Sequence, residues 1–201
     1  MITFNHEVWA TLDHKKMLLL SNLKSHEVVT AKHAFVLIPS KPGTFDLSYY
    51  QDTFSDPNTT KYLTISSDFS AEEYISRMNG DFFTPLGGSP NNLLYHIFPL
   101  ASDIKSKGPI GHVSIKDINW DRMSFHRGLV IRPGYQGNGI GSQVGIAVLN
   151  RMRALGFRTA LTEVKEGNEN SLKLVRKQFG EGILHDGKYL FELDLTQATL
   201  S

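Results

Sequence analysis

One stretch of this chain, residues 126–156, constrains the fold more than any other. Residues 125–132 are rich in β-branched and apolar side chains and are followed by Pro133 and Gly134, so we expect a strand that stops there. Beyond the turn, apolar side chains recur near the spacing of a helix with one buried face: Ile140, Val144, Ala147, Val148, Met152 and Leu155. Gly156 follows at the place of a left-handed C-terminal cap. The stretch therefore predicts a strand, a turn and a helix in direct succession.

The turn between the predicted strand and helix is rich in glycine. It reads Gln136-Gly137-Asn138-Gly139-Ile140-Gly141, with three glycines in five positions. Glycine leaves the backbone N–H groups uncovered, and at the start of a helix these groups add to the positive end of the helix dipole. The sequence therefore predicts an anion cradle, with a phosphorylated ligand as its natural occupant.

Glycine-rich turns have several meanings, and the pattern excludes one of them. A P-loop ends in Gly-Lys-Ser/Thr, which is absent here. A dinucleotide-binding fingerprint needs G-x-G-x-x-G and an acidic residue about 20 positions later. Ser142 stands where the third glycine would be, while Glu163 supplies the acidic residue. An NAD-type nucleotide binder and a tight turn without any ligand therefore stay open as alternatives.

Two sequence blocks together resemble a known family. Residues 130–141, VIRPGYQGNGIG, are similar to the acetyl-CoA signature of the GNAT superfamily of N-acetyltransferases. The core of that signature is Q/R-x-x-G-x-G/A, and Gln136, Gly139 and Gly141 occupy its fixed positions. Residues 168–171, NENS, resemble the N-x-x-S opening of the family's next helix, at the family's spacing. The resemblance covers residues 110–195, and the pair of blocks is more specific than either alone.

The composition predicts one ordinary globular domain. The chain has 201 residues, of which 40% are hydrophobic and 20% charged. A formal net charge of +1 offers no large basic surface, so we expect no nucleic-acid partner. The absence of cysteine excludes disulfides, thiolate metal sites and a cysteine nucleophile. The longest aliphatic run near the N-terminus, residues 17–20, is too short for a membrane span, and no signal peptide is evident. We therefore expect a cytoplasmic protein without a membrane partner.

The chain divides into an N-terminal extension, residues 1–31, and one domain, residues 32–201. In the extension, residues 13–23 have the spacing of a short helix, which we expect to pack on the domain or on a second subunit. The domain contains strand candidates at 34–38, 93–100, 111–118, 125–132, 159–164 and 189–195. In residues 111–118 apolar and polar side chains alternate, which predicts a half-buried strand. The pair Asp186-Gly187 predicts a two-residue hairpin turn before the last strand.

Two helices are predicted between the first two strands of the domain. Thr44 is the expected N-cap of the first, and Ser70 and Glu73 form a capping box for the second. Asp56-Pro57, followed by Tyr62-Leu63 and the Ser-x-Glu-Glu start of the second helix, resembles a GNAT subgroup more weakly than the first two blocks resemble the family. This subgroup acetylates ribosomal-protein N-termini, and the resemblance extends to its polyamine and amino-sugar relatives. In that superfamily these helices line the acceptor side. The resemblance therefore makes five aromatic residues candidates for acceptor contacts: Tyr49, Tyr50, Tyr62, Phe82 and Phe83. The alternative for each is a place in the core.

The family resemblance implies a fold and a cofactor. It implies a single α/β domain with a central mixed, twisted sheet and helices on both faces. Two parallel strands of this sheet would splay apart at the cofactor site. A right-handed crossover joins such parallel strands. Acetyl-CoA is the implied acetyl donor, and no metal is implied because the histidines lack ligand spacing. The pyrophosphate would bind the backbone of Gln136, Gly137, Asn138, Gly139, Ile140 and Gly141. The pantetheine arm would pair with the backbone near Val130, Ile131 and Arg132, and Asn168 would hold a pantetheine amide.

Acetyl transfer needs a base for the amine proton, donors for the oxyanion and an acid for the departing thiolate. Many family members carry a tyrosine as the acid where this chain has Val175. The ribosomal-protein subgroup instead resembles this chain in having a serine, here Ser171, whose alternative role is a helix-capping hydroxyl. A backbone N–H near Val130 would bind the oxyanion. Glu163 is the first candidate for the base. His126 is the second, because an unperturbed histidine has a pKa of about 6.5. Glu181 and Asp186 are further alternatives, and for each of the four a solvated surface role is the competing interpretation.

Three functions follow from these patterns. The first is an acetyl-CoA-dependent N-acetyltransferase that acts directly on a primary amine, either a protein N-terminus or a small-molecule amine. The second is a GNAT-like domain that binds acyl-CoA as a sensor or interaction module with little turnover. The third is the NAD-type nucleotide binder. The sequence leaves the acceptor open, and it is compatible with a homodimer.

Overall fold

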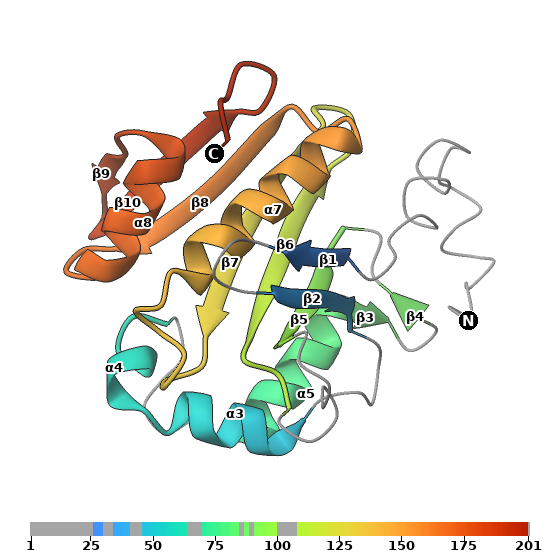
Figure 1. The fold of residues 1–201 in the computed structure, drawn as a ribbon, viewed down its shortest axis with the longest axis vertical. Coiled ribbons are helices and arrows are strands. Elements are labelled where there is room, and N and C mark those ends of the chain that lie inside the picture. The colour runs from blue at the N-terminus through green and yellow to red at the C-terminus, as the bar shows by residue number, and fades with distance from the viewer. Residues whose placement is uncertain are drawn as a thin grey trace.

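The structure is a computed structural model that describes residues 26–29, 34–40, 46–63, 70–84, 87–88, 91–99 and 108–200. These residues form an eight-stranded sheet in the order β1-β2-β5-β6-β7-β8-β10-β9 (Figure 1). The strands are β1 (His26–Val29), β2 (Ala34–Pro39), β5 (Leu93–Pro99), β6 (Gly111–Asn119), β7 (Ser124–Ile131), β8 (Thr159–Lys165), β9 (Ile183–His185) and β10 (Lys188–Asp194). All neighbours are antiparallel except β7 and β8, which are parallel. The predicted mixed sheet is confirmed.

Helices cover both faces of this sheet, as predicted. They are α3 (Leu47–Phe54), α4 (Pro57–Thr60), α5 (Ala71–Phe82), α7 (Ile140–Ala154) and α8 (Glu169–Phe179). The apolar faces of α7 and α8 pack in one core with alternate residues of the central strands, among them Val113, Ile115 and Phe125. On the opposite face α3 packs against α5, and its side chains contact the intervening residues of β5 and β6. In Figure 1 α7 crosses in front of the sheet, and α3 lies at its lower end.

Three local predictions are confirmed by the backbone. Ser70 and Glu73 cap each other reciprocally, because the Ser70 N–H donates to Glu73 Oε2 over 2.8 Å and the Glu73 N–H donates to Ser70 Oγ over 3.1 Å. Asp186 and Gly187 have φ angles of 48° and 72° and form the two-residue turn between β9 and β10. Gly156 has a φ of 92° directly after α7, as a C-terminal cap requires.

The start of α3 differs from the prediction. Asp46, not Thr44, is the N-cap, and its carboxylate accepts from the Tyr49 N–H over 3.1 Å. Thr44 lies outside the described residues. A carboxylate fits this position because it accepts from an unpaired N–H and also meets the positive end of the helix dipole. A second acidic cap, Asp56, starts α4, with Pro57 in the first helical position.

Strand β6 is buried on both faces, whereas its alternating pattern predicted burial on one. His112 and Ser114 are only 3% and 7% exposed. Their face of the sheet is covered by α3 and α5, which come from a distant part of the chain. The polar residues of a strand therefore did not mark a solvated face here, because the covering helix brings its own polar groups to meet them.

Two further segments add to the predicted outline. Strand β1 lies inside the segment assigned to the N-terminal extension, and it pairs with β2, so the sheet begins before residue 32. The rest of that segment, including the predicted helix at 13–23, lies outside the described residues. The loop predicted at 85–92 contains β4 (Gly87–Gly88), which pairs with β3 (Phe83–Thr84). In the described part of the chain, no helix combines the length and the apolar character that a membrane crossing needs.

Candidate site at the divergence of two parallel strands

Strands β7 and β8 pair over only part of their length. Their register runs from Ser124 opposite Thr159 to His126 opposite Leu161 and then stops. Both strands continue beyond this point, β7 to Ile131 and β8 to Lys165. We call the space between these unpaired ends the gap. The predicted splay of the two parallel strands is therefore present.

The backbone groups that face the gap follow from the pairing of β7 with β6. The Arg132 N–H donates to the Ile110 carbonyl over 2.9 Å, so residue 132 faces β6. Because backbone groups alternate in direction along an antiparallel strand, Val130 also faces β6, and Leu129 and Ile131 face the gap. The backbone near Val130, Ile131 and Arg132 was predicted to pair with a ligand. Of these residues Ile131 faces the gap, Val130 and Arg132 face β6, and Leu129 is a further residue on the gap side.

Two of the carbonyl groups on the gap side already have partners. The Arg127 carbonyl accepts from the Thr162 hydroxyl over 2.9 Å, at the inner end of the gap. The Ile131 carbonyl accepts from Nε2 of Gln136 over 2.8 Å, at the outer end. Between them, the N–H and C=O of Leu129 face the gap. An extended chain with amide groups could pair with Leu129 as an additional strand would.

The glycine turn, residues 133–139, lies at the outer end of the gap and leads into α7. Gly134, Gly137 and Gly139 have φ angles of 58°, 77° and 76°, the left-handed region that favours glycine. A Cβ built on any of the three would meet no atom within 4 Å, so this side of the turn is open. Gly139 is the N-cap of α7, and no side chain caps the helix there.

The N–H groups of the turn are available to a ligand. Among the described residues, the N–H groups of Gly137, Gly139, Ile140 and Gly141 have no hydrogen-bond acceptor. Helix starts carry such unpaired donors together with about half a positive charge from the dipole. An open, glycine-lined turn with unpaired donors fits a pyrophosphate group.

The last glycine of the signature has a different environment. A Cβ on Gly141 would lie 3.1 Å from Leu174 Cδ1 of α8 and 3.6 Å from Leu129 Cδ2 of β7. Gly141 therefore lets α7 approach both α8 and the gap-side strand closely. The same contacts show that the first turn of α7 lies directly beside the gap.

Side chains fix the turn to α3 and α4. The Gln136 amide donates to the Thr59 hydroxyl of α4 over 3.3 Å, in addition to the Ile131 carbonyl. The Arg132 guanidinium forms an ion pair with the Asp52 carboxylate of α3. Asn138 donates to the Gln136 carbonyl over 3.3 Å within the turn. The side chains of Gln136, Asn138 and Arg132, three residues predicted to bind the cofactor, therefore hold the shape or position of the turn.

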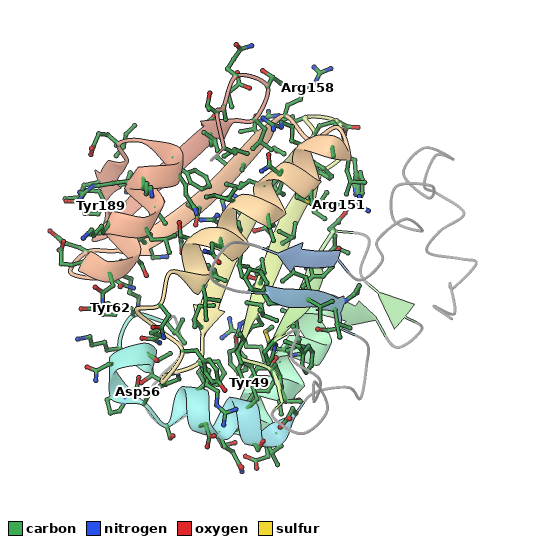
Figure 2. All side chains as sticks on the ribbon, in the orientation of Figure 1. Tyr49, Asp56, Tyr62, Arg151, Arg158 and Tyr189 are labelled. Atoms are coloured by element: carbon green, nitrogen blue, oxygen red, sulfur yellow. The ribbon has the colours of Figure 1, made fainter. Side chains whose placement is uncertain are left out.

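The α4 segment, residues 56–63, contacts the glycine turn at one place and the end of β8 at another. The Tyr62 hydroxyl donates to the Gly167 carbonyl over 2.6 Å, and the Lys165 ammonium donates to the Leu63 carbonyl over 2.8 Å. Figure 2 shows Tyr62 between α4 and the end of β8. The segment therefore spans the two sides of the gap, and Tyr62 is half-buried at its border.

Tyr49 and Tyr50, predicted as candidates for acceptor contacts, lie in the core. Both are 0% exposed. The Tyr49 hydroxyl pairs with Nδ1 of His112 at 2.8 Å, and the Tyr50 hydroxyl pairs with Nε2 of His96 at 2.9 Å. Burial lowers the pKa of His96 to about 4 and that of His112 to about 3, so both imidazoles are neutral at pH 7. The side chain of Phe82 and that of Phe83, the remaining candidates, lie outside the described residues.

Asn168 and Ser171 start α8. Asn168 is the N-cap, and its side-chain oxygen accepts from the Ser171 N–H over 3.3 Å. The capping role considered for the Ser171 hydroxyl therefore belongs to Asn168. Within the described chain the Ser171 hydroxyl has no hydrogen-bond partner, and the residue is half-buried. Ser171 Oγ is thus free to donate to a ligand.

The two leading candidate bases lie on neighbouring strands. His126 is exposed opposite Leu161, and Glu163 follows two residues later on β8, so both side chains are on the α3 face of the sheet. Glu163 Oε1 forms an ion pair with the Lys188 ammonium at 2.7 Å. The structure therefore brings these two residues to one face beside the gap.

The two further alternatives for the base are remote from the turn. Glu181 is exposed and lies 3.4 Å from the Arg176 guanidinium. Asp186 is exposed in the hairpin between β9 and β10 and lies 3.0 Å from His185. Both belong to the β9 edge of the sheet, and neither contacts a residue of the gap.

Sequence reasoning missed Arg127, Leu129 and Thr162. Arg127 is 4% exposed and lies at the inner end of the gap. The sequence carried a signal for it, because Arg127 alternates with Phe125 and Leu129 on what should be an apolar face. For Leu129 and Thr162 no such signal exists, since their roles depend on strand register.

Comparison with known proteins gives a consistent assignment. The acetyltransferase (GNAT) domain family matches residues 36–178. The structure of a spermidine N-acetyltransferase from Vibrio cholerae in complex with CoA and spermine has a TM-score of 0.61 at 16% identity, over 81% of this chain and 96% of that one. Mycobacterium smegmatis RimJ in complex with CoA-disulfide has a TM-score of 0.62 at 13% identity, over 85% and 86%. An acetyltransferase (GNAT family) from Bacillus anthracis has a TM-score of 0.58 at 15% identity, over 86% and 100%.

These structural likenesses establish the fold, at identities too low to transfer a substrate. No curated protein sequence matches this chain. The family match extends over well more than half of the 201 residues and contains the gap, the glycine turn and most of α8. The chain belongs to the GNAT acetyltransferase family.

Proposed function

We propose that this protein is an acetyl-CoA-dependent N-acetyltransferase that transfers an acetyl group directly to a primary amine. The observation that carries the proposal is the direct adjacency of two features, the open glycine turn at the start of α7 and the gap between β7 and β8. Gly141 joins them, because it contacts Leu129 on the gap-side strand and belongs to the first turn of α7. One feature fits a pyrophosphate, and the other fits an amide-bearing arm.

In this proposal the backbone does most of the binding. The N–H groups of Gly137, Gly139 and Gly141 hold the pyrophosphate. The C=O of Leu129 accepts from an amide of the pantetheine arm, and Asn168 contacts the same arm from the start of α8. Gln136 keeps the turn in place through its bond to the Ile131 carbonyl.

Bound acetyl-CoA supplies an acetyl thioester as the acyl donor. The chain must remove a proton from the attacking amine, and Glu163 or His126 is the proposed base, since both side chains are on the α3 face of the sheet. The Ser171 hydroxyl is the proposed hydrogen-bond donor to the departing sulfur, because it has no other partner in the described chain. The Leu129 N–H is the proposed donor to the thioester oxygen.

Two classes of amine acceptor agree with this site, a small-molecule amine and a protein N-terminus. The solved structures with the same fold include a spermidine acetyltransferase and RimJ. Residues 56–73 resemble the ribosomal-protein subgroup together with its polyamine and amino-sugar relatives, which agrees with both classes. In either case the acceptor would enter beside the α4 segment, where Tyr62 borders the gap.

A second candidate function is an acyl-CoA-binding domain with little turnover. Glu163 favours it, because the carboxylate Oε1 already accepts from the Lys188 ammonium at 2.7 Å and so has a partner other than an amine substrate. Val175, buried where many family members have a tyrosine, also favours it. Tight binding of acetyl-CoA without acetylation of any amine in a broad panel would identify this function.

The first experiment is thermal unfolding with acetyl-CoA, coenzyme A and NAD in parallel. A ligand that binds only the folded state stabilises it by about 2.7 kcal/mol at 100 times its dissociation constant. We expect a shift with both coenzyme A species and none with NAD. Stabilisation by NAD alone would support the nucleotide-binding alternative, and the absence of any shift with either coenzyme A species would overturn the proposal.

A further inference from the structure

Arg127 is a buried cation at the inner end of the gap. Its side chain is on the α7 and α8 face of β7, and the residue is 4% exposed. Its own carbonyl accepts from the Thr162 hydroxyl where β7 and β8 stop pairing. The backbone of Arg127 therefore lies at the point from which the two strands diverge, and its guanidinium lies on the helix side of that point, against α7 and α8.

No negative charge compensates Arg127 within the described part of the protein. Its Nη1 donates to the amide oxygen of Gln178 over 2.8 Å, and its guanidinium carbon lies 4.9 Å from the centre of the Phe179 ring. Gly145 of α7 lies directly over it, since a Cβ there would be 2.8 Å from Nη1. Among the described residues its Nε has no hydrogen-bond partner.

The charge persists despite burial. Burial lowers the pKa of Arg127 to about 10, which still leaves the guanidinium protonated at neutral pH. The groups that pack against it from α7, α8 and β8 are Gly145, Gln178, Phe179 and Thr162, and none of them ionises. An uncompensated buried charge is costly to a folded protein. Its presence beside a ligand site suggests that the ligand supplies the compensating charge.

The neighbouring amide solvates this charge but does not neutralise it. Gln178 Nε2 donates to the Ser142 carbonyl over 2.9 Å, which turns the amide oxygen toward Arg127. Ser142 belongs to the first turn of α7, directly after the glycine turn. The guanidinium is therefore held rigidly relative to the proposed phosphate cradle.

The position of Arg127 along β7 indicates which part of a ligand it would meet. Ile131 adjoins the glycine turn at the outer end, and four residues of strand, roughly 13 Å at about 3.3 Å per residue, separate it from Arg127. The phosphates would therefore lie at the far end of the gap from Arg127. The reactive sulfur end of the arm would be directed toward the inner end.

We propose that Arg127 supplies a fixed positive charge that stabilises the thiolate of coenzyme A released in acetyl transfer. This inference rests on the proposed function. In the transfer a C–N bond forms, the C–S bond breaks, its electron pair stays on sulfur, and the amine proton goes to the base. Sulfur thus gains a negative charge in the step, and a buried cation acts on it strongly because the surroundings screen little.

The test compares the binding of coenzyme A, whose thiol ionises, with that of acetyl-CoA, whose sulfur does not. Calorimetry would give both dissociation constants from pH 6 to pH 9 for the wild type, Arg127→Met and Arg127→Lys. If the bound thiol has its pKa lowered by one unit, the affinity for coenzyme A relative to acetyl-CoA rises about tenfold over this range. We expect this rise in the wild type, its loss in Arg127→Met, and its partial recovery in Arg127→Lys.

A second variant neutralises the charge of Arg127 with a neighbouring carboxylate and keeps the guanidinium in place. Gln178→Glu places a carboxylate against the guanidinium, and we expect it to abolish the rise as Arg127→Met does. Arg153→Met is the matched control, because it removes one positive charge from an exposed position on α7. Denaturant unfolding of the ligand-free proteins checks the fold, and Arg127→Met should be no less stable than the wild type because it removes a buried unpaired charge.

The possible outcomes separate this inference from the proposed function. The affinity for coenzyme A relative to acetyl-CoA could be the same in the wild type and Arg127→Met at every pH. This result would overturn the role of Arg127 while leaving acetyl-CoA binding established. An equal loss of affinity for both ligands in Arg127→Met would place its charge at the phosphates and overturn the thiolate role. If the wild type bound neither ligand, the proposed function itself would fail.

Discussion

The Thr162 hydroxyl donates to the Arg127 carbonyl over 2.9 Å at the point where β7 and β8 cease to pair. In a continuous parallel ladder, this carbonyl would accept from a backbone N–H of β8. Thr162 supplies a side-chain donor in its place, so the strands separate without leaving a buried acceptor unpaired. A single hydroxyl thus allows the sheet to open at this site.

Replacing this hydroxyl should destabilise the protein. Thr162→Val keeps the shape of the side chain but leaves the buried Arg127 carbonyl without a donor, at a cost of about 1–3 kcal/mol in the free energy of unfolding. Urea unfolding of the ligand-free protein measures it, with Thr162→Ser as the control that retains the hydroxyl. An unchanged midpoint in Thr162→Val would show that water or backbone movement satisfies the carbonyl.

Gly139 and Gly187 form a matched pair for testing the cradle. Both have positive φ, 76° and 72°, and a Cβ on either would meet no atom within 4 Å. Alanine at either position should therefore cost a similar stability, about 1–2 kcal/mol for the left-handed conformation. Only Gly139 lies at the start of α7, so only Gly139→Ala should weaken acetyl-CoA binding, because the added Cβ covers the backbone that faces the ligand.

Calorimetric titration with acetyl-CoA would compare the two variants at equal folded fraction. A bulkier change, Gly139→Val, should abolish binding. Equal affinity in Gly139→Ala, Gly187→Ala and the wild type would show that the glycine turn is only a turn.

The buried histidines predict that stability falls on acidification. The pKa of His96 is lowered to about 4 and that of His112 to about 3, from an ordinary value of 6.5. Between the ordinary pKa of 6.5 and the lowered pKa of each buried histidine, the unfolded chain binds more protons than the folded one. Unfolding therefore becomes easier as the pH falls below 6.5. Their full contribution to stability is present above pH 6.5 and should decrease by about 2 kcal/mol per histidine by pH 5.

Urea unfolding between pH 7.5 and pH 4.5 would measure this slope. His112→Gln removes one titrating group, so the slope should become shallower even if the variant is less stable at pH 7. Its neutral amide can still pair with the Tyr49 hydroxyl, which replaces the bond of 2.8 Å seen in the wild type. A slope identical to that of the wild type would mean that other groups dominate the acid sensitivity.

Glu163 provides a direct test of the proposed base. If its carboxylate removes the amine proton, Glu163→Gln should lower kcat about 10²–10⁴-fold and eliminate the acidic limb of the pH–rate profile. Its ion pair with Lys188 is partly exposed, so the free energy of unfolding should change by less than about 1 kcal/mol. Glu166→Gln, an exposed neighbour after β8, is the control and should leave kcat unchanged. Full activity in Glu163→Gln would direct attention to His126.

Local signals in the sequence predicted those features whose partners are close along the chain. The Ser70–Glu73 capping box joins residues three apart, and the Asp186–Gly187 turn needs only two adjacent residues with positive φ. The strand, glycine turn and helix of residues 125–156 belong to the same class. The cap and the turn are formed by near neighbours, and the strand and the helix carry a regular apolar pattern, so the local sequence is sufficient to predict each of them.

The same local reasoning failed at one helix start and where the partner is distant along the chain. Thr44 was the predicted cap of α3, and the structure uses Asp46, two residues later. His112 and Ser114 carried the pattern of a solvated face, yet α3 covers them with Tyr49, from more than 60 residues earlier in the chain. No periodicity within β6 could report that helix.

The sequence by itself determined the family of the chain, the glycine turn and the order of strand, helix and strand around it. Only the tertiary structure decided that β7 and β8 separate after His126, that Leu129 rather than Val130 faces the gap, and that Arg127 is buried there without a counter-charge. The physical reason lies in the range of the interactions. Turns and caps are formed by hydrogen bonds between near neighbours, whereas strand register and burial depend on which distant elements pack together.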